Sequence, residues 1–238
     1  MRSGNRALLK ACLPVFVALI LLVPVPSGAV EEIPPTYVQV FIGAAQFNED
    51  RMTFEKAAED DPGTITTNDL STMPYLGFGG QFAFGESESH AGLDATLLFG
   101  WRSHNSSVTA GNGQAYVKLD TELWMLDLAM GLYAQTVLGD RWRVYAAAGP
   151  LMLFAGYSED AEEEDLETAP TETDKESSTD SEFGIGGYAR VGLEYRLQTG
   201  AFMGICVRGV KTNLEFNNTI DDGGLDGVQG FLTYSQPF

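Results

Sequence analysis

The sequence predicts an all-β fold, namely an eight-stranded antiparallel transmembrane β-barrel of up-and-down topology that follows a cleaved signal peptide. Three observations predict this fold. The chain starts with a cationic and then apolar segment, the remainder alternates apolar and polar residues with period two, and the connections between the alternating segments are in turn short and long.

The first segment has the composition of an export signal. Its cationic start contains Arg2, Arg6 and Lys10, its apolar stretch runs over residues 13–25, and the small residues Ser27, Gly28 and Ala29 follow. We expect cleavage after Ala29, which divides the chain into a signal peptide, 1–29, and a barrel domain, 30–238. An uncleaved membrane helix is the alternative. It is disfavoured because Pro14 and Pro24 interrupt an apolar stretch shorter than the roughly 20 residues that a spanning helix needs.

The exported chain is one strongly acidic domain. Residues 30–238 are 209 residues, and removal of three basic and no acidic residues lowers the formal net charge from −19 to −22. Such a charge disfavours nucleic acid as a partner, because phosphate binding needs clustered Lys and Arg. Cys206 is the only cysteine after Ala29, so no intramolecular disulfide is expected.

Period-two alternation is clearest in residues 183–197. One face carries Phe183, Ile185, Gly187, Ala189, Val191, Leu193, Tyr195 and Leu197, and the other carries Gly184, Gly186, Tyr188, Arg190, Gly192, Glu194 and Arg196. Residues 91–103 divide in the same way. In a soluble sandwich the apolar face would point to a core, whereas in a membrane barrel it points to lipid, and one strand cannot separate the two folds.

The complete set of segments favours the barrel. We expect strands at residues 36–47, 74–85, 91–103, 116–138, 142–157, 183–197, 201–214 and 227–238. The turns near 85–90, 139–141 and 198–200 are short, and the connections 48–73, 104–115, 158–182 and 215–226 are long. Membrane barrels have short periplasmic turns and long extracellular loops, so the rhythm predicts both the number of strands and their orientation.

The signal peptide, the eight amphipathic strands and the last strand together resemble a known group. They are similar to the small outer-membrane barrels of the OmpX/Ail and OmpA-transmembrane-domain type, and in second place to OmpW-like barrels. The resemblance implies the outer membrane of a diderm bacterium, lipid and lipopolysaccharide as surroundings, and a C-terminal strand that the barrel-assembly machinery reads through Tyr234 and Phe238. Pro237 departs from the pattern of that strand.

Charged residues fall on the predicted inward faces. They are Asp94, Arg102, Asp127, Arg143, Arg190, Glu194, Arg196 and Arg208. The interior of a closed eight-stranded barrel is about wide enough for its side chains, so these charges must pair or retain water. We expect a structural network of ion pairs that fills the lumen. A narrow polar pore or an ion path is the alternative.

The connection 158–182 is the most acidic part of the chain, with twelve acidic residues and one basic residue, Lys175. Many like charges and few apolar residues predict a solvated, mobile surface loop. Its run of acidic residues lacks the ordered spacing and the glycine of a calcium loop, so at most it would associate loosely with Ca²⁺ or Mg²⁺ that bridge to lipopolysaccharide phosphates.

Catalytic chemistry has little support in this sequence. His104, Ser106 and Glu122 are faintly similar to the His-Ser-Glu arrangement of outer-membrane lipid A deacylases, but a polar loop is the preferred interpretation of this segment. Cys206 is expected to be a small lumen-facing residue. We therefore expect no catalytic residues, metal site or cofactor, and a structural or surface-interaction role. A narrow channel for ions or small apolar molecules is the alternative, and a lipid A-modifying hydrolase is the third hypothesis.

Overall fold

The computed structural model describes residues 36–57, 65–84, 90–110, 115–139, 141–165, 175–216 and 224–238. The expected signal peptide, 1–29, lies outside these residues and stays a prediction. Within the described ranges, no helix is both long enough and apolar enough to cross a bilayer.

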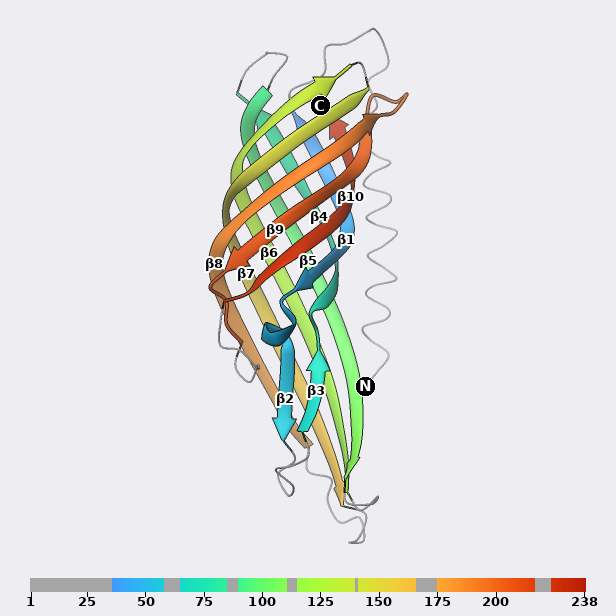
Figure 1. Cartoon of the computed structure of the whole chain (residues 1–238), viewed down its shortest axis with the longest axis vertical. Coiled ribbons are helices and arrows are strands. Elements are labelled where there is room, and N and C mark those ends of the chain that lie inside the picture. Colours follow the sequence, from blue (N-terminus) through green and yellow to red (C-terminus); the bar gives the residue numbers. More distant parts are fainter. Residues whose placement is uncertain are drawn as a thin grey trace. The chain divides into compact units, whose positions relative to one another are not determined.

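Eight of the ten strands close into one antiparallel barrel (Figure 1). The strands are β1 (Tyr37–Phe47), β2 (Thr53–Ala57), β3 (Ile65–Asp69), β4 (Thr72–Ala83), β5 (His90–Ala110), β6 (Ala115–Leu138), β7 (Trp142–Asp165), β8 (Lys175–Arg196), β9 (Phe202–Thr212) and β10 (Asp226–Pro237). Their order around the barrel is β1-β10-β9-β8-β7-β6-β5-β4, and β1 closes it by pairing with both β10 and β4. The predicted fold class of the barrel is confirmed.

The two ends of the barrel differ. At one end, called the turn end, the strands are joined by tight connections, and Gly139 and Gly200 adopt the positive φ angles of 64° and 87° that glycine tolerates best. The C-terminus lies at this end, at the top of Figure 1. At the opposite loop end, β5 to β8 continue past the other four strands. Of the predicted turn at 85–90, residues 85–89 lie outside the described ranges, and β5 begins at His90.

The faces of the strands follow the predicted alternation. In β8, Ile185 and Val191 are 56% and 59% exposed, whereas Arg190 and Glu194 between and beyond them are 2% and 0% exposed. In this part of β8 the large apolar residues therefore lie outside and the charged ones inside, which is the reverse of a soluble sandwich. Large apolar side chains are exposed on all eight barrel strands, including Ile42, Phe78, Leu93, Leu132, Phe154, Ile205 and Leu232.

Two of the predicted long loops are mostly strand. The connection 104–115 forms the paired ends of β5 and β6, up to Ala110 opposite Ala115, and much of 158–182 belongs to β7 and β8, which pair out to Glu162 opposite Lys175. The prediction of a solvated loop over all of 158–182 is therefore wrong. The charge pattern misled the prediction because neighbouring strands that leave the barrel already aligned can continue their backbone ladder whatever the charge of their side chains.

The connection 48–73 contains a hairpin that we did not predict. After the one-turn helix η1 (Glu49–Arg51), capped by the Asn48 side chain, β2 and β3 pair antiparallel from Thr53 opposite Asp69. Neither strand alternates apolar and polar residues, so period-two alternation did not indicate them. The two ends of this connection lie side by side at the barrel, where Phe47 N donates to Ser71 O at 2.8 Å.

Candidate functional site

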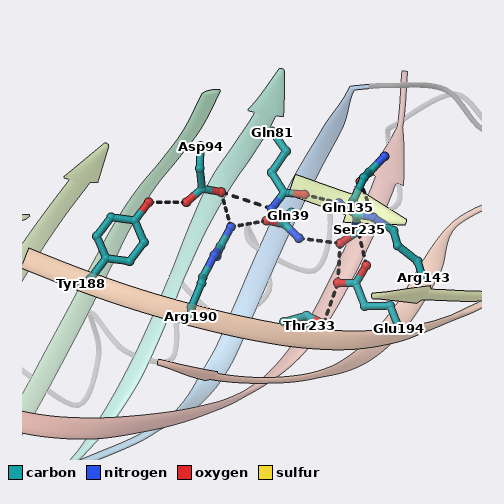
Figure 2. Close-up of polar contacts among 10 residues, drawn as sticks. All are labelled: Gln39, Gln81, Asp94, Gln135, Arg143, Tyr188, Arg190, Glu194, Thr233 and Ser235. Atoms are coloured by element: carbon teal, nitrogen blue, oxygen red, sulfur yellow. Dashed lines mark hydrogen bonds and ion pairs between the residues drawn. The ribbon is translucent and has the colours of Figure 1, made fainter. Parts of the chain in front are cut away.

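The lumen of the barrel is divided into two halves of different chemistry. The half toward the turn end contains a polar ring, which we define as Gln39, Gln81, Asp94, Arg143, Arg190, Glu194 and Ser235 (Figure 2). The half toward the loop end, called the apolar half, is lined by Leu98, Leu123, Met125, Leu151, Leu153 and Ala155. Strand parity places both sets inside, since every second residue of each strand points inward.

One side of the polar ring runs through Glu194. Arg143 NH1 donates to Glu194 Oε2 at 2.7 Å, and the Ser235 hydroxyl donates to Glu194 Oε1 at 2.8 Å. Gln39 Nε2 then donates to Ser235 Oγ at 3.0 Å, and its own Oε1 accepts from Arg190 at 2.8 Å. The chain of contacts thus joins β7, β8, β10 and β1.

The other side of the ring runs through Asp94. Arg190 pairs with Asp94 Oδ1, which also accepts from Gln81 Nε2 at 3.2 Å. Gln81 Oε1 in turn accepts from Arg143, so the series of hydrogen bonds closes on itself (Figure 2). Each buried carboxylate therefore has at least two donors, as a desolvated charge requires.

Further polar side chains complete the ring's contacts. Tyr188 donates to Asp94 Oδ2 at 2.6 Å, Thr233 donates to Glu194 Oε1 at 2.8 Å, and Arg143 Nε donates to Gln135 Oε1 at 2.7 Å. These neutral partners were missed in the sequence because only charged residues were considered. Their inward parity was the signal that could have found them.

A separate ion pair lies between the ring and the apolar half. Both terminal nitrogens of Arg208 donate to the two carboxylate oxygens of Asp127, at 2.6 and 2.9 Å, and NH1 also donates to Gln229 at 2.8 Å. This pair spans the lumen from β9 to β6, strands that are not neighbours in the barrel. It is bidentate, which is the stronger geometry for an Arg–carboxylate pair.

The buried arginines also lie against aromatic rings. The guanidinium carbon of Arg143 is 3.8 Å from the centre of the Tyr37 ring, that of Arg190 is 4.9 Å from Phe41, and that of Arg208 is 4.8 Å from Tyr188. Cation–π contacts of this kind are more favourable when the cation is removed from water. The lumen therefore offers each cation an anion and a ring.

Two of the eight predicted lumen charges lie outside these clusters. Arg102 is half-buried near the loop end and donates to the Thr72 carbonyl oxygen, and Arg196 is half-buried at the last position of β8. Their parity is the predicted one, but both stand at the ends of the lumen rather than within it. The six residues within it are Asp94, Asp127, Arg143, Arg190, Glu194 and Arg208, three anions and three cations that are at most 2% exposed.

Connections at the loop end close the apolar half. Met52 and Leu70, from the connection between β1 and β4, are 0% exposed and joined by a hydrogen bond from Leu70 N to Met52 O at 3.0 Å. Leu214 and Leu225, which flank the connection from β9 to β10, are joined by the bond from Leu225 N to Leu214 O at 3.0 Å. All four side chains belong to the same apolar cluster as the lining.

The residues of the weak hydrolase hypothesis are not assembled. Glu122 lies opposite Ser103 and accepts from Trp101 Nε1 at 2.7 Å, on the outward face, whereas His104 has the inward parity of β5. The side chain of Ser106 lies outside the described part. Cys206 is 2% exposed and has inward parity, as predicted. Among the described residues, no three His, Cys, Asp or Glu side chains are grouped to hold a metal ion.

The structure gives the positions of the predicted C-terminal signal residues, Tyr234 and Phe238. Phe238 is 65% exposed at the turn end, and its N–H donates to the Thr36 carbonyl oxygen at 3.3 Å, beyond Pro237. The Tyr234 hydroxyl donates to Gln236 at 3.0 Å. Recognition of Tyr234 and Phe238 by the assembly machinery stays a prediction.

Comparison with known proteins identifies a family. A family model described as "Outer membrane protein beta-barrel domain" matches residues 15–231. No curated protein matches the sequence. Among solved structures, the chain is similar to the attachment invasion locus protein Ail of Yersinia pestis, with 10% identity, coverage of 86% of this chain and 100% of that one, and a TM-score of 0.41.

Two other solved structures have comparable similarity. Neisserial surface protein A is 11% identical, with coverage of 87% of this chain and 100% of that one and a TM-score of 0.42. The N-terminal β-barrel domain of Pseudomonas aeruginosa OprF is 11% identical, with coverage of 85% and 98% and a TM-score of 0.29.

Proposed function

The chain belongs to the outer-membrane β-barrel protein family, and from this premise we propose that it is an integral outer-membrane protein with a closed lumen and a structural or surface-interaction role. It would be exported by its N-terminal signal and inserted in the outer membrane of a diderm bacterium. Neither a reaction nor a cofactor is part of the proposal.

The observation that carries the closed lumen is the polar ring. Its seven residues form one uninterrupted circuit of hydrogen bonds, and with the Arg208–Asp127 pair the three buried cations balance three buried anions. An ion that crossed the lumen would have to break this circuit, and each charge left uncompensated costs several kcal/mol. It would then meet the apolar half, which solvates no ion.

The outer wall supports insertion in a bilayer. On β7, the exposed rings of Trp142 and Phe154 are separated by twelve residues, which is about 40 Å along a strand and about 28 Å across a membrane for a tilt of about 45°. Trp142 packs edge-on against Tyr195 near the turn end, and Phe154 packs against Phe183 nearer the loop end. Aromatic residues at two such levels are typical of the two membrane interfaces.

The strand extensions at the loop end support the surface role. Residues 159–165 of β7 include six acidic residues, and 175–182 of β8 include three acidic residues and one basic residue. With the turn end in the periplasm, these strands would carry an acidic surface beyond the membrane. Such a surface would attract divalent cations only loosely, consistent with the weak cation association predicted from the sequence.

Conductance of the refolded protein in planar bilayers tests the closed lumen. We expect no steady openings from the unmodified protein, because the ring and the apolar half obstruct the lumen in series. Long-lived openings would contradict the proposal and favour the narrow channel. The double variant Arg143→Ala and Glu194→Ala removes one side of the ring and should give more frequent brief openings, whereas Arg141→Ala, at an exposed cation two residues away, should match the unmodified protein.

A further inference from the structure

The wall of the barrel closes where β1 meets β10, a contact that we call the seam. The two strands pair antiparallel from Tyr37 opposite Pro237 to Phe47 opposite Gly227. A slip of one residue would turn every side chain of a strand to the wrong side of the wall, whereas a slip of two residues would leave each on its own side. Alternation therefore does not choose between the observed register and registers shifted by two residues, and another interaction has to make that choice.

Glu194 contacts the seam from β8, although β9 lies between β8 and β10. On β9 the residue opposite Glu194 is Gly204, and the residue opposite Gly204 on β10 is Thr233. The Glu194 side chain extends over Gly204, and its Oε1 accepts hydrogen bonds from the Thr233 and Ser235 hydroxyls, both at 2.8 Å (Figure 2). One carboxylate thus holds two successive inward residues of the last barrel strand.

This crossing depends on the absence of a side chain at Gly204. A Cβ atom built there would overlap the Leu193 carbonyl oxygen and would lie 2.8 Å from the Cγ atom of Glu194. Gly209, on the outward face of the same strand, differs in this respect, since a Cβ built there meets nothing within 4 Å. Gly204 therefore lets the Glu194 side chain pass over β9 to reach β10.

The contact continues from β10 to β1. Ser235 lies opposite Gln39, whose Nε2 donates to Ser235 Oγ at 3.0 Å and whose Oε1 accepts from Arg190 of β8 at 2.8 Å. Both strands of the seam are thus held from β8 by side chains four residues apart. A slip of β1 by two residues would place Tyr37 or Phe41 opposite Ser235 instead, and neither side chain has an amide that could join Ser235 to Arg190.

We propose that Glu194, together with Gly204 and the two hydroxyls, is a latch that fixes the register of the seam. A slip of β10 by two residues would bring Phe231 or Pro237 to one of the two hydroxyl positions, and neither side chain donates a hydrogen bond. The buried carboxylate would then lose one of its donors, which is unfavourable in a site without water. The latch concerns closure of the wall, so it does not depend on whether the lumen conducts.

Disulfide trapping on the outer face of the seam reports its register. The full chain, in which Ala replaces both cysteines, is refolded into lipid vesicles and oxidised mildly. Leu232→Cys is combined with Ile42→Cys, its partner in the observed register, or with Val40→Cys or Ala44→Cys, which become its partners after a slip of two residues. A disulfide needs Cα atoms within about 7 Å of each other. With the latch intact, we expect the two slipped pairs to link about tenfold less than the native pair.

Removal of the two hydroxyls is the decisive variant. Thr233→Val combined with Ser235→Ala nearly conserves volume and leaves the pairing of Glu194 with Arg143 in place. We expect the slipped links to increase about tenfold, because each lost hydrogen bond had a charged acceptor. The control is Thr96→Val, since Thr96 is buried and inward like Thr233 and its hydroxyl has no hydrogen-bond partner among the described residues. It should leave the links unchanged.

The glycine gives a second measure of the latch. Gly204→Ala displaces the Glu194 side chain and should also increase the slipped links, whereas Gly209→Ala should not. Slipped links that stay rare in the hydroxyl variant overturn the latch. Loss of the native link without any slipped link overturns it too, because the contacts would then hold the seam closed and not in register. Strand pairing is measured here independently of conductance, so failure of the latch is distinguishable from failure of the proposed function.

Discussion

The two halves of the lumen are filled by different kinds of interaction. The polar ring places buried charges in a circuit where each partner has a defined distance and direction, whereas the apolar half fills its space with Leu, Met and Ala side chains and is covered by Met52 and Leu70. Charges buried in a circuit are intolerant of losing one member. Apolar packing depends on volume and tolerates substitutions that conserve it.

The largest expected effect is the removal of one carboxylate from the ring. Glu194→Ala leaves Arg143 buried without its anion and removes the acceptor of Thr233 and Ser235. We expect the free energy of unfolding in urea, measured by tryptophan fluorescence in detergent micelles, to fall by about 3–5 kcal/mol. Glu215→Ala, at an exposed carboxylate, is the control. A loss below about 1 kcal/mol in Glu194→Ala would show that the ring is not a buried circuit.

A cavity in the apolar half should cost somewhat less. Leu123 is 0% exposed, and Leu123→Ala should lower the free energy of unfolding by about 2–4 kcal/mol in the same assay. Leu123→Met conserves volume and should cost less than about 1.5 kcal/mol. If both variants were equally destabilised, the apolar half would depend on shape as strictly as the ring does, and the contrast between the halves would fail.

The ion pair between the halves tests whether charge is needed there at all. Replacing Arg208 with Met, Asp127 with Leu and Gln229 with Leu together removes every member of that cluster and extends the apolar half. We expect the free energy of unfolding to stay within about 1 kcal/mol of the unmodified value or to rise. Arg208→Met alone leaves the buried Asp127 carboxylate without its cation and should be clearly destabilising. Equal losses in the single and triple variants would mean that this position requires the ion pair itself.

The smallest effect concerns the cover of the apolar half and its dependence on pH. Partial burial raises the pKa of Asp69. Hydrogen bonds from the Ser71 hydroxyl and N–H, together with the charges of Arg102 and His104, lower it by more, so the pKa of Asp69 lies below its usual value. The ionised Asp69 carboxylate therefore stabilises the connection between β1 and β4 at pH values above the ordinary aspartate pKa of about 3.9. This contribution is lost as the pH falls through the lowered value.

Amide hydrogen exchange of Ser71 measures this effect, because the Ser71 N–H donates to Asp69 Oδ1 at 2.7 Å. Protection should be unchanged from pH 7 to 5 and should decrease, after correction for intrinsic exchange, below about pH 4. Asp69→Asn should show the reduced protection at every pH. A decrease that persists unchanged in Asp69→Asn would assign the pH dependence to another group.

Much of the fold was predictable because it depends on a local rule. Period-two alternation put Arg190 and Glu194 on one face of β8, and the rhythm of short and long connections, which indicated a barrel, assigned that face to the lumen. Alternation did not reveal that β5 and β7 extend past residues 103 and 157 or that β8 begins before residue 183. These extensions follow from strand pairing. Residues 159–162 continue β7 between β6 and β8, and residues 163–165 continue it against β6 alone.

The sequence by itself determined the number of barrel strands, the side of the wall on which most residues stand and the presence of charges of both signs inside. Only the tertiary structure decided the partners, since Arg208 meets Asp127 across the lumen at a sequence separation of 81 residues and Gln39 joins Arg190 and Ser235 in the ring. It also decided that Met52 and Leu70 cover the apolar half. The physical reason is that parity depends on the chain's own backbone, whereas partners depend on the register and stagger with which the closed barrel sets one strand against another.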